Sequence, residues 1–139
     1  MAKKFIFIND IHVGYTTSAS VEPEIETNET ATFDGAVVDG TDDPSYIVEI
    51  EKLRYGTIAE YIQLEQLLIN MYTKGYPIKI IENVSMKDGE MKIRDIVYDC
   101  KLDGNDYELD AEERTAENLS FKGSSRRRWI NDKEIKKTV

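Results

Sequence analysis

Only one stretch of this chain, residues 57–75, has the spacing of apolar residues that a long helix requires. Thr57 and Glu60 form a Thr-x-x-Glu capping box, which satisfies two backbone N–H groups at a helix start, and Gly75 ends the helix. Between them, apolar residues recur every three or four positions and predict a stripe that packs on a sheet. They are Ile58, Tyr61, Ile62, Leu64, Leu67, Leu68, Met71 and Tyr72.

Short runs of alternating apolar and polar residues predict strands on both sides of this helix. In one run, Tyr46, Val48 and Ile50 fall on one face, whereas Glu49 and Glu51 fall on the other. Further strands are expected at residues 3–8, 11–15, 77–86, 91–102 and 110–124, with an edge strand or extended arm within residues 16–30. The fold class indicated is mainly β (α+β), an antiparallel β-sandwich or barrel with one flanking helix.

Two of the expected strands have irregular patterns. In residues 91–102 the apolar positions change from odd to even numbers, which predicts a β-bulge near residues 94–95. Residues 110–124 are polar on both faces until Leu119 and Phe121. Such a strand suits a sheet that lines water on one side or pairs with another subunit.

Length and composition limit the class of protein. A chain of 139 residues fits one domain, and its 40% hydrophobic and 32% charged content is typical of soluble globular proteins. The net charge of −9 argues against nucleic acid as a tightly bound ligand. The apolar run at the N-terminus is broken by Asn9 and Asp10, so we expect neither a signal peptide nor a membrane segment.

Charge is segregated along the sequence. Residues 5–51 contain eleven acidic residues and no Lys or Arg, whereas residues 122–139 contain seven basic and two acidic residues. One explanation is solvated loops with a loose basic end. The other is an acidic surface that attracts the basic tail of a neighbouring copy. We expect residues 1–125 to form the β domain and residues 126–139 to form a basic C-terminal extension.

No segment of the sequence assembles a catalytic site. Asp10 and His12 follow a short strand and resemble the opening Asp-x-His of calcineurin-like metallophosphoesterases. That metal site needs several further histidines, and His12 is the only one in the chain. Cys100 has no partner for catalysis and is expected to be a buried small hydrophobe. We therefore expect no enzyme activity, no cofactor and no metal.

The basic cluster near the C-terminus has two interpretations. Arg126, Arg127 and Arg128 precede Trp129, and guanidinium groups with an aromatic ring can stack on nucleic-acid bases. Alternatively, a basic extension docks on an acidic neighbour. The acidic body of the protein favours docking.

The succession of elements from residue 33 onward resembles that of the tail tube proteins of contractile-tailed phages and phage-tail-like bacteriocins. In that family a turn-rich loop precedes a long strand, which is similar here to residues 46–54. A helix follows, then a hairpin such as residues 78–97, and a final strand such as residues 113–121. The resemblance lies in the order and pattern of the elements.

This resemblance implies a structural protein. Family members form hexameric rings that stack into a hollow tube, with strands of each subunit lining an inner barrel and the helix outside it. DNA, or in bacteriocins only ions, passes through an acidic lumen without specific binding. The expected partners are further copies of the chain and the tail sheath, baseplate and tape-measure proteins. The expected location is a virion tail, or a tail-like particle, assembled in the host cytoplasm.

The tube hypothesis assigns residues to two surfaces. Acidic residues on outer strand faces are expected to face the lumen, namely Glu49, Glu51, Asp95 and Asp99. Contacts between rings are expected from the loop at residues 34–45 and from the basic tail, through Asp39, Asp42, Asp43, Arg126, Arg127 and Arg128. Under this hypothesis the subunit completes its β-structure only by joining identical neighbours.

Two other functions fit the same sequence. A tube of the kind used by type VI secretion would share the hexameric ring. A monomeric β-sandwich could instead bind a ligand in a groove beside the helix. A stable monomer at high concentration would favour this binding module over both tubes.

Overall fold

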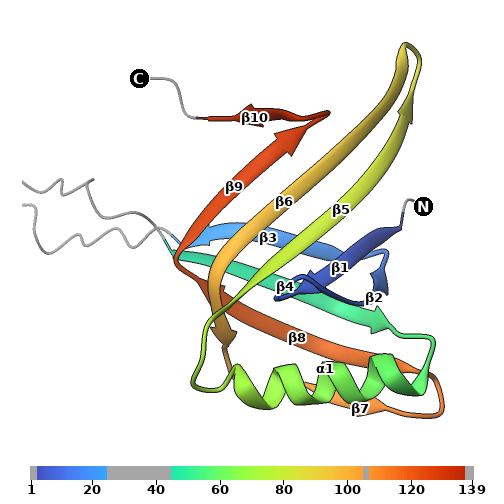
Figure 1. Ribbon diagram of the computed structural model, residues 1–139, viewed down its shortest axis with the longest axis vertical. Helices are drawn as coiled ribbons and strands as arrows, with labels where there is room; N and C mark the ends of the chain where they lie inside the picture. The colour runs from blue at the N-terminus through green and yellow to red at the C-terminus, as the bar shows by residue number, and fades with distance from the viewer. Residues whose placement is uncertain (1–2, 25–44, 105–106, 137–139) are drawn as a thin grey trace, which may run out of the picture.

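The computed structural model describes residues 3–24, 45–104 and 107–136, in which one helix accompanies ten strands (Figure 1). The elements are β1 (Lys4–Ile8), β2 (Ile11–Thr16), β3 (Ala19–Glu24), β4 (Ser45–Arg54), α1 (Ile58–Asn70), β5 (Tyr76–Met86), β6 (Gly89–Leu102), β7 (Glu108–Asp110), β8 (Thr115–Gly123), β9 (Ser125–Ile130) and β10 (Lys133–Ile135).

Six of the strands form a closed antiparallel barrel in the order β6-β5-β1-β2-β4-β8. The barrel closes where Lys101 and Leu102 of β6 pair with Lys122 and Phe121 of β8. The expected mainly β fold with one flanking helix is therefore confirmed. The expectation that the β-structure closes only between subunits is wrong, because the β6–β8 pairing closes the barrel within one chain.

Four further strands lie outside the barrel. β3 pairs with β4, β7 with β8, β9 with β6 and β10 with β9. Among the described residues, β3, β7 and β10 each pair along one side only. These three strands are the edges at which a neighbouring chain could add hydrogen bonds. The position of β3, which contains Pro23, confirms the edge strand expected within residues 16–30.

The core fills the barrel and extends beneath the helix. Ile6, Ile50, Ile78 and Phe121 are fully buried in it. α1 adds Leu64, Leu67 and Leu68, and Met71 at the C-cap of the helix is buried beside them. The Leu102 N–H donates to the Met71 carbonyl at 2.9 Å, which ties the end of the helix segment to β6. In Figure 1 α1 lies at the foot of the molecule, and the strand that it contacts most is β2.

The capping box at the helix start is confirmed. The Glu60 N–H donates to Thr57 Oγ1 at 3.1 Å, and the Gly56 N–H donates to Glu60 Oε1 at 3.2 Å. The expected packing stripe is only partly correct. Ile58, Ile62 and Tyr72 are exposed rather than packed on the sheet.

A β-bulge interrupts β6, but not where the sequence placed it. Pairing with β5 is regular through Arg94 and Asp95, and the register shifts between Tyr76 and Ile78 of β5. The extra residue therefore lies between Val97 and Cys100, where Asp99 has a φ of 56°. The apolar pattern misplaced the bulge because Asp95, although charged, lies on the inward face.

β8 is shorter and more apolar on one face than the sequence indicated. Residues 111–114 form a turn, and the strand starts at Thr115. Ala116, Leu119, Phe121 and Gly123 are buried along its inner face. The prediction of two polar faces is therefore wrong, because small residues were counted as polar surface. A Cβ at Gly123 would lie 2.5 Å from Val97 Cγ1, so β8 and β6 approach closely here.

The basic C-terminal stretch is not a separate extension. Residues 125–130 form β9, in which Arg126 and Arg128 lie opposite Val97 and Asp95 of β6. β10 then folds back on β9. The expected boundary between residues 125 and 126 falls within a strand of the sheet.

Cys100 occupies the position expected for a small core residue. It is fully buried, and its thiol donates to the Val97 carbonyl at 3.3 Å. Burial raises the pKa of this thiol to about 12.

We expect Cys100 to resist an aromatic disulfide reagent at pH 8 in the folded protein, because only the thiolate attacks and the thiol is covered. In urea the same thiol should react promptly. Absorbance of the released thiolate measures both rates. Equal rates with and without urea would contradict the burial of Cys100.

Candidate functional site

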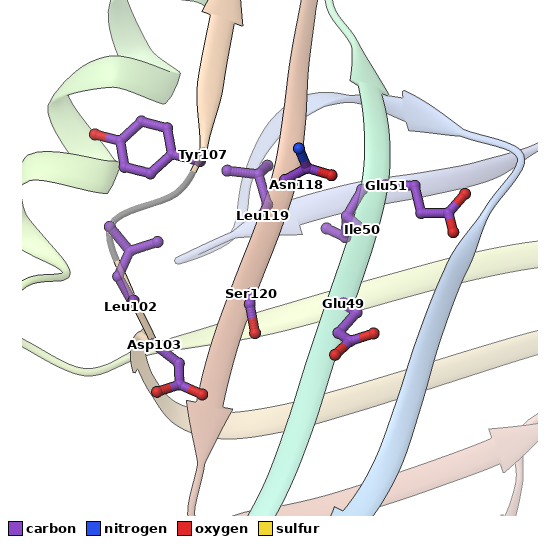
Figure 2. A pocket seen from close by; sticks show the side chains of 10 residues that line it. Glu49, Ile50, Glu51, Leu102, Asp103, Tyr107, Asn118, Leu119 and Ser120 are labelled. Carbon is purple, nitrogen blue, oxygen red and sulfur yellow. The ribbon is translucent and has the colours of Figure 1, made fainter.

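An open depression of about 540 Å³ lies on the outer surface of the barrel, beside β4 and β8 (Figure 2). The apolar residues Ile50, Leu102 and Leu119 line it. Its polar lining consists of Glu49, Glu51, Asp103, Tyr107, Asn118 and Ser120. Three carboxylates thus share one concave surface.

Strand alternation places two of these carboxylates. Val48 and Ile50 point into the core, so Glu49 and Glu51 point outward. Glu49 lies opposite Ser120 of β8. The outward orientation of both glutamates agrees with the sequence-based expectation for this strand.

The third carboxylate, Asp103, was not predicted as a site residue. It directly follows β6, and its N–H donates to the Ser120 carbonyl at 2.9 Å. This hydrogen bond holds the end of β6 beside β8, at the seam that closes the barrel. Asp103 could not be assigned to a site from the sequence, because no local signal shows that the end of β6 pairs with β8.

The charged side chains that line the depression are all acidic. Among the residues that the structure describes, no Lys or Arg lines it. Within residues 3–24, 45–104 and 107–136, none of the ion pairs uses Glu49, Glu51 or Asp103. The nearest lysines along the two strands are paired with other acids, Lys52 with Glu117 at 3.3 Å and Lys122 with Glu24 at 3.2 Å. The surface therefore carries an excess of negative charge.

Asp95 does not belong to this surface. It is only 7% exposed, and both its oxygens accept hydrogen bonds from Arg126, from Nε and Nη2 at 2.7 Å each. Arg128 Nη1 lies 3.7 Å from Asp95 Oδ2. The hydrogen bond that Arg126 donates to the Asp95 carboxylate raises the pKa of Arg126. The expectation that Asp95 faces a lumen is wrong, because the two arginines of β9 draw this carboxylate onto the inward face.

Asp99 is exposed but lies elsewhere. It occupies the bulge of β6, next to Gly75 in the connection between α1 and β5. A Cβ at Gly75 would collide with the Asp99 carboxylate, which gives a physical reason for glycine there. Of the four acids expected to face a lumen, the structure brings together Glu49 and Glu51 and places Asp95 and Asp99 away from them.

The residues expected to form contacts between rings fall into two groups. Asp39, Asp42 and Asp43 lie outside the described residues. Arg126 pairs with Asp95, and Arg127 Nε pairs with Glu134 Oε1 at 2.7 Å. The guanidinium carbons of Arg127 and Arg94 each lie 4.7 Å from the centre of the Trp129 ring. The basic cluster is therefore held by contacts within its own chain.

Asp10 and His12 make unrelated contacts. Lys79 Nζ lies 3.7 Å from Asp10 Oδ1. His12 Nδ1 lies 3.6 Å from Glu60 Oε2, and its ring centre lies 5.1 Å from that of Phe7. The described part of the chain contains no group of three His, Cys, Asp or Glu side chains placed to hold a metal ion.

The comparisons add no identification: no protein-family model, curated protein or solved structure matches this chain. In the described residues, no helix has the length and apolar character needed to cross a membrane.

Proposed function

We propose that this chain is a tail tube subunit, of the kind found in contractile-tailed phages and phage-tail-like bacteriocins. In this proposal hexameric rings of the chain stack into a tube, and DNA, or only ions, passes through the bore. The protein would belong to a virion tail or tail-like particle assembled in the host cytoplasm. Tail sheath, baseplate and tape-measure proteins would be its neighbours.

The acidic depression is the observation that carries this proposal. Glu49, Glu51 and Asp103 share a concave surface whose described lining contains no Lys or Arg. At physiological salt, charges interact over a screening length of about 8 Å. A carboxylate wall therefore repels phosphates only at close range, so DNA can fill a bore without adhering to it.

The outer strands provide a route to assembly. The barrel core is complete in one copy, so a neighbour would add to what lies outside it. The open sides of β3, β7 and β10 can accept backbone hydrogen bonds from another chain. Ring closure would cover these edges, which otherwise favour irregular aggregation.

The position of Ser120 allows a direct test of the bore. Ser120 lies in the acidic depression opposite Glu49, and a Ser120→Cys variant adds one accessible thiol to a protein whose native Cys100 is buried. In assembled fractions we expect a small maleimide to label residue 120 and a maleimide on a bulky protein carrier to be excluded. In single subunits both reagents should react.

Two outcomes would contradict the proposal. Exclusion of the small reagent as well would show that the depression is a contact surface and not a bore. A chain that remains single at every concentration would remove the basis for a tube. Dissociated subunits of the same variant serve as the control.

One further observation favours a ligand-binding module as the second candidate. A smaller depression of about 250 Å³ lies beside the start of α1, lined by Tyr55, Tyr61, Ile58 and Arg114 among others. It matches the groove beside the helix that such a module would use. A monomer that binds a small aromatic or anionic ligand there, and never assembles, would favour this function.

A further inference from the structure

One side of α1 is an apolar surface that no other described part of the chain covers. Ile58, Ile62, Ile69 and Tyr72 are 80%, 60%, 54% and 47% exposed. With Glu65 they recur every three or four residues, so they form one line along the helix. Single exposed apolar residues are common, but four on one line, interrupted only by Glu65, indicate an interaction surface. We call this line the helix stripe.

A second uncovered apolar surface lies at the opposite end of the molecule. In Figure 1 the β5–β6 hairpin rises away from α1 toward the head, with β9 and β10 beside it. Ile80 and Val97 point into the barrel. The pairing of β5, β6, β9 and β10 shows which side chains lie on the same face of the sheet beyond the barrel. The apolar ones are Val84, Met86, Met91, Ile93, Ile130 and Ile135. We call this surface the wing face.

The wing face is only partly buried. Met86 is 55% exposed and Ile135 is 49% exposed, and the other four apolar residues are half-buried. The barrel core ends near Asp95, so side chains beyond it have no opposite wall. The wing face is therefore a partly apolar sheet surface with no partner among the described residues.

The two surfaces have opposite charge. α1 contains Glu60 and Glu65 and no Lys or Arg. On the wing face, Arg126 and Arg128 share the single carboxylate of Asp95, and Lys133 lies opposite Ile130. Glu82 faces Lys4, whose Nζ lies 3.8 Å from it. The wing face thus has more positive than negative groups, and the helix stripe carries a negative one.

We propose that the helix stripe of one copy docks on the wing face of the next copy. This inference rests on the self-assembly in the proposed function and names its contact surfaces. The helix, at about 1.5 Å per residue, offers an apolar line of roughly 20 Å. Glu65 of one copy would lie near Arg128 or Lys133 of the next copy. These opposite charges would favour one orientation of the contact.

The proposed contact is heterologous, because it joins the foot of one copy to the head of another. Repetition of one such contact generates a closed ring or an open filament, according to the rotation between copies. A two-fold dimer could use both surfaces only if the foot of each copy met the head of the other at the same time. A one-way repeat instead leaves one surface free at each end, so it predicts assemblies larger than dimers and a ladder of linked multimers.

Cross-linking between two variants tests this contact. Ile62→Cys and Ile135→Cys each place one thiol on an exposed position, and Cys100 is buried and contributes none. When the two variants are mixed and oxidised with copper phenanthroline, we expect a disulfide-linked dimer on a non-reducing gel. A double variant should form a ladder of multimers. Gln63→Cys mixed with Ile135→Cys is the matched control, because Gln63 is exposed on the same helix but off the stripe, and it should link at least tenfold less.

The remaining outcomes each overturn the inference. A dimer formed by Ile62→Cys alone would show that two helices meet. If the mixed variants assemble into rings but form no disulfide link, the contact between copies lies elsewhere. The proposed function would then still stand. A chain that binds another protein and never its own copies would reject both.

Discussion

Replacing Phe121 with alanine is expected to lower the free energy of unfolding by about 3–5 kcal/mol. Phe121 is fully buried in β8, where it pairs with Val48 of β4 and with Leu102 of β6. It therefore fills the core at the seam that closes the barrel. Native domains are stable by only about 5–15 kcal/mol, so this loss should shift the urea midpoint strongly.

Phe5→Ala is the matched control for this prediction. Phe5 is half-buried in β1, next to the fully buried Ile6 and on the opposite side of the strand. The same ring is removed, but little core volume is lost. If Phe5→Ala lowers stability as much as Phe121→Ala does, the inner and outer faces of the barrel have been assigned incorrectly.

Replacing Asp95 with alanine is expected to cost about 3 kcal/mol of stability, because two guanidinium groups lose their buried partner. The Asp95 side chain is 10% exposed and that of Arg126 is 22% exposed, so solvent can replace only part of the lost bond. The ion pair also anchors β9 to β6, so its loss should loosen the C-terminal strands. Urea unfolding followed by circular dichroism measures the change.

Glu134→Ala removes a second arginine ion pair and provides the comparison. Arg127 and Glu134 also meet at 2.7 Å, but the Arg127 side chain is 52% exposed. Exposed ion pairs contribute little to stability, so the loss should be clearly smaller than for Asp95→Ala. An equal or larger loss for Glu134→Ala would show that Asp95 is not the buried anchor of β9.

Features set by neighbouring residues could be predicted from the sequence. The capping box at Thr57 and Glu60 and the outward glutamates of β4 depend on spacing within a few positions. The β5–β6 hairpin turn, with Gly89 at a φ of 145°, is equally local. These elements are correct because their signals do not need the rest of the fold.

Features set by distant pairs could not be predicted. Asp95 resembles a solvent-facing strand residue until Arg126, thirty-one residues later, is placed beside it. Asp103 joins the acidic depression only through the β6–β8 seam. Ile58, Ile62 and Tyr72 were assigned to the packed face because they share the helical spacing, whereas the barrel covers only the side with Leu64, Leu67 and Leu68.

Negative-stain electron microscopy of the purified, concentrated protein tests the tube assignment most directly. We expect rings with a stain-filled centre, and stacks of such rings at higher concentration. The Ile62→Cys and Ile135→Cys mixture should form the same rings before oxidation. Only small single particles, at every concentration and at moderate salt, would contradict the assignment of this chain to a tube.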